Sequence, residues 1–154
     1  ELAMAYSTRS QYHMLHDRME EAVNWGKRAI ELASRVDAQE TRAHALNNVG
    51  SALLFSGDEA GKDYMEESLR LSLQMGFHEQ AARAYTNYSE YAVITKQFDL
   101  AERLGARRVE VACVQFQGWA LENRAVLQPT REQAEEVRSE FRARPAASVG
   151  GPSA

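Results

Sequence analysis

Ala43-His-Ala-Leu-Asn-Asn-Val-Gly50 is the stretch that decides the fold, because it recurs 39 positions later, from 43 to 82, as Ala82-Arg-Ala-Tyr-Thr-Asn-Tyr-Ser89. Both copies have a small residue at each end and Asn at the same interior position. A second pair of segments, Ala29-Ile-Glu-Leu-Ala33 and Ser68-Leu-Arg-Leu-Ser72, has the same offset. Two independent segments in one register indicate an internal repeat.

Each repeat contains two apolar patterns with helical spacing, and neither pattern alternates as a half-buried strand would. The two patterns of the second repeat are separated by Ser56-Gly57-Asp58. Gly57 suits a left-handed residue that ends the first helix, and Asp58 suits the N-cap of the second. The sequence therefore predicts an all-α fold of antiparallel helical hairpins.

The repeat register predicts three to four hairpins, followed by a tail. Their expected limits are about 2–35, 38–75, 78–112 and 114–142. The second helix of the third hairpin is expected to run from about 99 to 112. Thr130-Arg-Glu-Gln133 has the form of a capping box, which favours a helix in the fourth unit. Residues 143–154 are rich in Ala, Gly, Pro and Ser, which is typical of a disordered tail or linker.

Small residues carry the most specific part of the repeat pattern. Ala22, Gly26 and Ala29 share one face of a helix, and Gly50 lies in the middle of another. We expect Gly26 and Gly50 to lie where neighbouring helices approach closely, since two helices cross closely only where side chains are short. The pattern resembles the tetratricopeptide (TPR) repeat, with a longer period than the usual 34 residues.

That resemblance implies an α-solenoid, in which the hairpins stack as a right-handed superhelix and the first helix of each unit lies on the concave face. The segments Leu46-Asn-Asn-Val-Gly50 and Glu66-Glu-Ser-Leu-Arg-Leu-Ser72 are also similar to the repeat region of large bacterial LuxR-family ATP-binding transcriptional regulators. The chain begins at Glu1 without an initiator Met, so we expect it to be a fragment of a larger protein.

Alignment of the repeats with the TPR pattern assigns six candidate residues to a groove that binds a peptide. In the second and third units these are His44, Asn47, Asn48, Arg83, Asn87 and Glu90. The amides of Asn48 and Asn87 can both donate and accept a hydrogen bond, which suits the backbone of an extended peptide. Arg83 and His44 are candidates for binding an acidic group. The alternative is that the asparagines bond between helices or to water.

Motifs for catalysis or metal binding are absent from the sequence. His13, His16 and Asp17 have a spacing that metal ligands use, but no fourth ligand is apparent near them, so we expect no metal. Cys113 has no recognisable nucleophile motif around it. Without a glycine-rich phosphate loop or a catalytic triad motif, we expect neither an enzyme nor a cofactor.

Charge and hydropathy exclude two classes of partner. The net charge is -4 and the 18 basic residues are spread along the chain, so no surface for nucleic acid is expected. No run approaches the roughly 18 apolar residues that a membrane span needs. A single Cys and no apolar leader favour the cytoplasm.

The resulting functional prediction is a protein- or peptide-binding repeat module, the sensing or interaction segment of a larger bacterial signalling or transcription-regulatory protein. Its expected partners are a protein or peptide ligand, neighbouring domains of a parent chain, and a second copy of the chain that binds through the hairpin at 114–142. The alternative is a structural spacer or self-association scaffold with no ligand in its groove.

Overall fold

The computed structural model describes residues 1–105, 130–133, 135 and 139 of the 154-residue chain. The chain divides into two compact units, Glu1–Val109 and Glu110–Ala154. Six helices lie in the first unit, and none of the described residues lies in a strand. The helices are α1 Leu2–Met14, α2 Met19–Arg35, α3 Gln39–Phe55, α4 Gly61–Met75, α5 His78–Ile94 and α6 Phe98–Arg103. The predicted all-α fold is confirmed.

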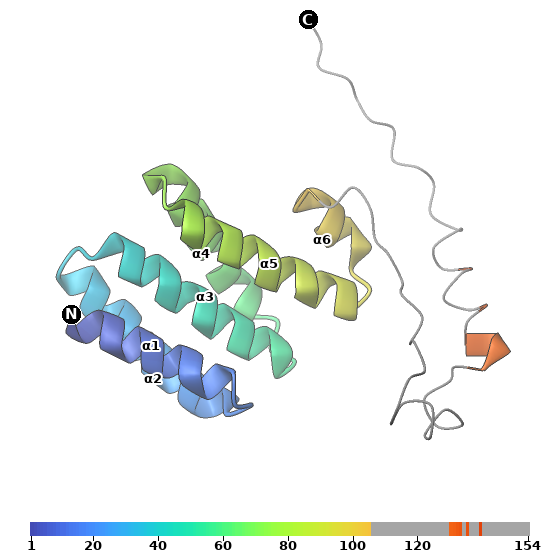
Figure 1. The fold of residues 1–154 in the computed structure, drawn as a ribbon, viewed down its shortest axis with the longest axis horizontal. Coiled ribbons are helices and arrows are strands. Elements are labelled where there is room, and N and C mark those ends of the chain that lie inside the picture. The colour runs from blue at the N-terminus through green and yellow to red at the C-terminus, as the bar shows by residue number, and fades with distance from the viewer. Residues whose placement is uncertain (106–129, 134, 136–138, 140–154) are drawn as a thin grey trace, which may run out of the picture. The chain divides into compact units, whose positions relative to one another are not determined.

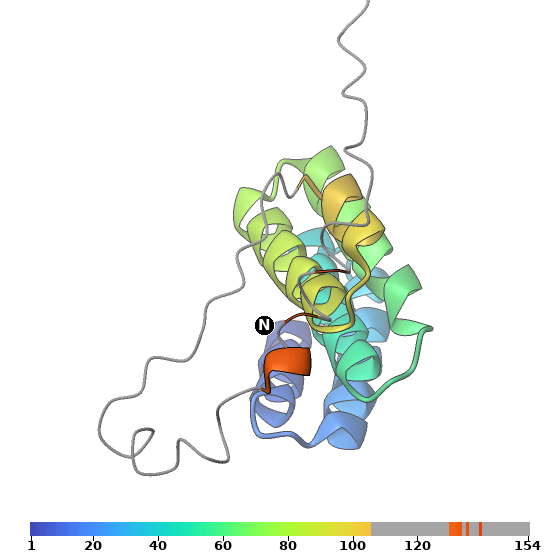
Figure 2. The same cartoon turned by 90° about the vertical axis from the view of Figure 1, so that its right-hand side faces the viewer.

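The helices of the first unit pack as consecutive antiparallel pairs, as the sequence predicted. Each helix contacts the next one along the chain, and α3 also contacts both α1 and α5. These three helices lie side by side in one layer, and α2 and α4 lie on the other side of α3 (Figure 1). Figure 2 shows the same arrangement at a right angle to that view. The central helix α3 is therefore the most enclosed, and most of its residues from Ala43 to Leu54 are buried.

Glycines allow the helices to approach closely, as predicted for Gly26 and Gly50. A Cβ atom added at Gly26 would collide with Val49 Cγ2 and lie 2.9 Å from Ser10 Oγ. A Cβ at Gly50 would lie 3.0 Å from the carbonyl oxygen of Gly61, at the start of α4. The prediction is confirmed at both positions. Gly61 completes the second contact, and the repeat pattern did not single it out.

The turns between helices share one backbone feature. Each contains a residue in the left-handed conformation, at Asp17, Asp37, Gly57, Gly76 and Lys96. Such a residue reverses the chain direction after a helix ends. Its regular recurrence places every hairpin turn in the same repeat register, and it confirms the left-handed conformation predicted for Gly57.

Two helix ends differ from the predictions. Asp58 is not the N-cap of α4, because a further turn intervenes and α4 begins at Gly61. The Asp58 carboxylate instead accepts a hydrogen bond from the Ala60 amide at 2.9 Å within that turn. The helix expected over 99–112 ends at Arg103, followed by Gly105 in the left-handed conformation at φ 94°. A glycine in this conformation terminates a helix in the same way as a C-cap.

Little of the second unit is described. The capping box predicted for Thr130 and Gln133 is confirmed: the Thr130 hydroxyl accepts from the Gln133 amide at 3.2 Å, and the Gln133 side chain accepts from the Thr130 amide at 2.9 Å. The predicted hairpin at 114–142 otherwise lies almost entirely outside the described residues, as do Cys113 and the predicted tail. Within the part of the chain that the structure describes, no helix is long and apolar enough to cross a membrane.

Candidate functional site

The six predicted groove residues lie on the two adjacent helices α3 and α5, but they are not equally accessible. His44, Asn47 and Asn48 on α3 are buried, with at most 8% of each residue exposed. On α5, Arg83 and Asn87 are half-buried and Glu90 is exposed. The reason is that α3 has a neighbouring helix on each side, whereas α5 presents one of its faces away from α3.

A buried hydrogen-bonded seam joins α1, α3 and α5. The Asn48 amide donates to the carbonyl oxygen of Ser7 at 3.0 Å, and Arg83 donates to Asn48 Oδ1 at 3.3 Å. Ser7 Oγ lies 2.6 Å from His44 Nδ1. Because the Asn48 amide is a donor and lies 3.4 Å from the same nitrogen, Nδ1 is best placed as an acceptor and the Ser7 hydroxyl as its donor.

The pKa of His44 is lowered to about 4, first by burial and then by the positive charge of Arg83. The imidazole is therefore neutral at neutral pH. It has no charge with which to bind an acidic ligand, and its ring nitrogen is already bonded to Ser7. Arg83 is likewise engaged, since its guanidinium donates to Asn48.

Asn47 and Asn87 form a second polar contact between α3 and α5. The Asn87 amide donates to Asn47 Oδ1 at 3.3 Å and to Ser51 Oγ at 3.2 Å. The Nδ2 atom of Asn47 is buried and has no hydrogen-bond partner among the described residues. Asn47 and Asn48 thus connect helices to one another, as in the alternative interpretation of the repeated asparagines. Their role in ligand binding stays a prediction.

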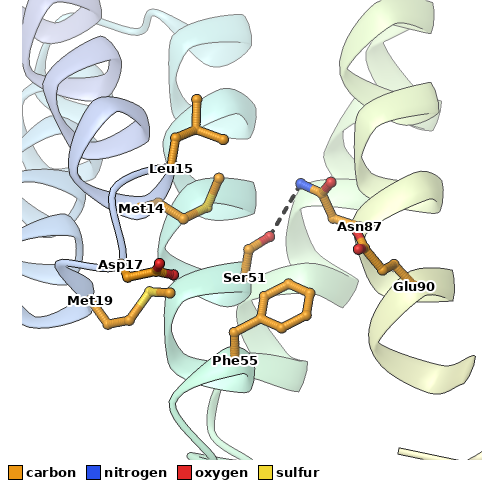
Figure 3. A pocket seen from close by; sticks show the side chains of 8 residues that line it. All are labelled: Met14, Leu15, Asp17, Met19, Ser51, Phe55, Asn87 and Glu90. Atoms are coloured by element: carbon orange, nitrogen blue, oxygen red, sulfur yellow. Dashed lines mark hydrogen bonds between the residues drawn. The ribbon is translucent and has the colours of Figure 1, made fainter. Parts of the chain in front are cut away.

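A pocket opens beside this contact, between the α1–α2 turn and α5, with α3 as its floor (Figure 3). Its volume is about 450 Å³. The lining residues are Met14, Leu15, Asp17, Met19, Ser51, Phe55, Asn87 and Glu90. Two of the predicted groove residues, Asn87 and Glu90, therefore line the pocket, whereas the other four belong to the polar contacts between helices.

Two of the apolar side chains that line the pocket are exposed. Leu15 is 68% exposed and Phe55 is 41% exposed. Together with Met14 and Met19 they form the apolar part of the lining, while Asp17 and Glu90 supply a carboxylate on each side (Figure 3). Exposed apolar side chains with polar groups at their rim are typical of an interaction site.

The α1–α2 turn contributes to this pocket, although the sequence pattern did not predict it. Met14, Leu15 and Met19 flank a hairpin turn, where the repeat register assigns no groove position. Their apolar character at an exposed turn was the available signal. In the sequence, the spacing of Asp17 relative to His13 and His16 indicated at most a metal ligand. The described residues contain no cluster of three groups suited to a metal, and His16 Nδ1 bonds to the carbonyl oxygen of Tyr12 at 2.7 Å.

The comparisons with known proteins give short similarities only. The chain is 60% identical over 42 residues to the PqqA peptide cyclase of Ruegeria pomeroyi, which is 27% of this chain and 11% of that protein. It is 62% identical over 42 residues to the PqqA peptide cyclase of Rhizobium meliloti, again 27% of this chain and 11% of the relative. The match to the enzyme of Streptomyces rochei is 44% identical over 57 residues, covering 37% of this chain and 16% of the relative. The chain therefore spans between about a tenth and a sixth of the length of these relatives. No family model and no solved structure matches the chain.

Proposed function

We propose that this chain is a protein- or peptide-binding helical repeat module that performs no chemistry of its own. The observation that carries the proposal is the pocket on α3 between the α1–α2 turn and α5. It combines large exposed apolar side chains, two carboxylates and an amide in one recess. Such a combination suits the side chains of a peptide or a protein segment.

In finer terms, the hairpins are TPR-like units of a right-handed superhelix, with α1, α3 and α5 on its concave face. The left-handed residue that recurs in every turn supports this assignment, because each of these helices then ends with the same reversal of the chain. The close approaches of α2 to α3 at Gly26 and of α3 to α4 at Gly50 support it as well, because such repeats pack successive helices tightly. The similarity of 46–50 and 66–72 to bacterial regulators supports a role as the interaction segment of a larger signalling or transcription-regulatory protein.

A displayed peptide library selected against the immobilised full chain tests the proposal. Phe55→Asp removes the exposed aromatic side chain of the pocket and introduces a charge there. Leu73→Asp is the matched control, because Leu73 is 56% exposed on α4 and lies outside the pocket. We expect selected peptides to bind the wild type and the Leu73 variant alike and to lose binding to the Phe55 variant. Equal binding to all three proteins, or no selected peptide, contradicts the proposal.

A second candidate function is binding of the PqqA peptide. The observation that favours it is the segment of 42 residues that is 60% identical to a protein named for cyclising that peptide. Calorimetric titration of the full chain with synthetic PqqA peptide tests this candidate directly. Saturable heat supports it, whereas the absence of heat removes PqqA and leaves the more general proposal to the library selection.

A further inference from the structure

The free polar atoms of the pocket are hydrogen-bond acceptors. Neither Asp17 nor Glu90 forms an ion pair or a side-chain hydrogen bond with another described residue. The side-chain Nδ2 of Asn87 already donates hydrogen bonds to Asn47 and Ser51. The side-chain oxygen Oδ1 of Asn87 is therefore the group that is left to accept a hydrogen bond. The Ser51 hydroxyl donates to the sulfur of Met65 at 3.7 Å. A ligand that pairs with this pocket therefore has to supply donors.

The two basic residues that the sequence assigned to the groove do not place a free positive charge in this pocket. Arg83 lies one helical turn from Asn87 and donates to Asn48 Oδ1. His44 is buried and bonded to Ser7. An acidic ligand would meet two carboxylates in the pocket and no free cation among its lining residues. The charge of the pocket is thus opposite to the one that Arg83 and His44 suggest in the sequence alone.

The apolar part of the pocket adapts to more than one side chain. Met14 and Met19 contribute flexible thioether side chains, which adjust to the shape of an apolar group more readily than branched side chains do. Phe55 adds an aromatic surface from the floor. The volume of about 450 Å³ lies within the range of about 300–1,000 Å³ for sites that hold small ligands. It fits a short segment and not a folded domain.

We propose that this pocket binds a basic, apolar peptide segment. An aliphatic or aromatic side chain of the segment packs against Leu15 and Phe55, and an adjacent Lys or Arg lies between the carboxylates of Asp17 and Glu90. A backbone amide of the segment donates to Asn87 Oδ1. This inference rests on the proposed function and adds the chemical class of the ligand.

Two short synthetic peptides of equal length and equal apolar content are the probes. One carries Leu and Phe flanked by lysines, and in the other glutamates replace the lysines. Binding to the full chain is measured by fluorescence anisotropy at low and at high NaCl concentration. The location of binding is read from the methyl resonances of Met14 and Met19, with Met75 at the end of α4 as the internal reference.

We expect the basic peptide to bind at least tenfold more tightly than the acidic peptide, and its affinity to fall as NaCl screens the charges. Glu90→Gln and Asp17→Asn should each weaken the basic peptide by about threefold to fivefold, the scale of a partly exposed ion pair. Asn is chosen at position 17 because it tolerates the left-handed conformation that Asp17 adopts. Asp63→Asn, on the exposed side of α4, should leave binding unchanged.

Several results would overturn the inference, and they separate it from the proposed function. If the acidic peptide binds more tightly, or if both carboxylate variants bind the basic peptide like the wild type, the assigned ligand class is wrong while peptide binding itself stands. If Met75 shifts and Met14 and Met19 do not, the peptide binds outside this pocket. If neither probe binds and the library selection also yields no peptide, the inference and the proposed function both fail.

Discussion

Adding one methyl group at Gly26 tests the close packing of α2 against α3. The Cβ of Gly26→Ala would lie well inside 3.0 Å of Val49 Cγ2. Val49 is fully buried and β-branched, so its side chain has no alternative rotamer that avoids the contact at low cost. The helices therefore have to separate locally, or Val49 has to leave its preferred conformation.

The expected free energy change is the difference between two opposing effects. Overpacking of a core contact costs about 1–3 kcal/mol. Replacing Gly by Ala inside a helix stabilises it by about 0.5–1 kcal/mol, because Ala loses less conformational entropy on folding. We expect the overpacking to win and Gly26→Ala to lower the free energy of unfolding by about 1–2 kcal/mol.

A double-mutant cycle separates this contact from a general effect on stability. Val49→Ala removes the colliding methyl group and by itself costs about 1.5–2.5 kcal/mol through lost burial and the cavity it leaves. In the double variant the new methyl group occupies part of that cavity. The two changes should therefore be less destabilising together than their sum by about 1 kcal/mol.

The assay is urea unfolding of the full chain, followed by the helical circular dichroism signal. The cycle requires four proteins: the wild type, the two single variants and the double variant. If Gly26→Ala is as stable as the wild type or more stable, the close approach at Gly26 is wrong. Additive effects of the two substitutions would show that Val49 is not the group that the new methyl meets.

Three further predictions concern the polar seam, a turn and the core. In the folded chain the pKa of His44 is about 4, below the usual value of 6.5. The unfolded chain therefore binds more protons than the folded chain between these pH values. The contribution of neutral, buried His44 to the free energy of unfolding is lost as pH falls from 6.5 towards 4. The free energy of unfolding should fall between pH 7.5 and 4.5 by about 1–2 kcal/mol more in the wild type than in His44→Gln, measured by urea unfolding, and equal pH dependence would contradict this. Gly57 has φ 87°, and a Cβ added there would meet no atom within 4 Å. The backbone conformation alone therefore sets the cost, so Gly57→Ala should cost about 1 kcal/mol and Gly57→Asn less, as measured by thermal unfolding. Met65 is fully buried against Gly50, so Met65→Ala should cost about 2–5 kcal/mol in chemical unfolding, whereas Met75→Ala at an exposed position should cost under about 0.5 kcal/mol.

Only part of the candidate site could be predicted from the sequence. The repeat register identified Asn87 and Glu90 as facing the groove, and both line the pocket. It also assigned Asn48 and His44 to the groove, and the structure buries them. A register gives the direction of a side chain relative to its own helix. It does not give the distance to the neighbouring helix. In the structure, α1 lies close enough for Ser7 to form hydrogen bonds with the side chains of both His44 and Asn48.

The helical hairpins, their order and the close contacts at Gly26 and Gly50 were determined by the sequence itself, because apolar periodicity and the absence of a side chain act locally. The capping box at Thr130 and Gln133 is local in the same way. The tertiary structure alone decided that the α1–α2 turn reaches the level of Phe55 and Glu90 and closes a pocket with them. It also decided the sign of the charge there, because Arg83 bonds to a buried amide while Asp17 and Glu90 keep their carboxylates free of partners among the described residues. Residues that are far apart in the chain meet through the stacking of whole hairpins, and no local pattern encodes that distance.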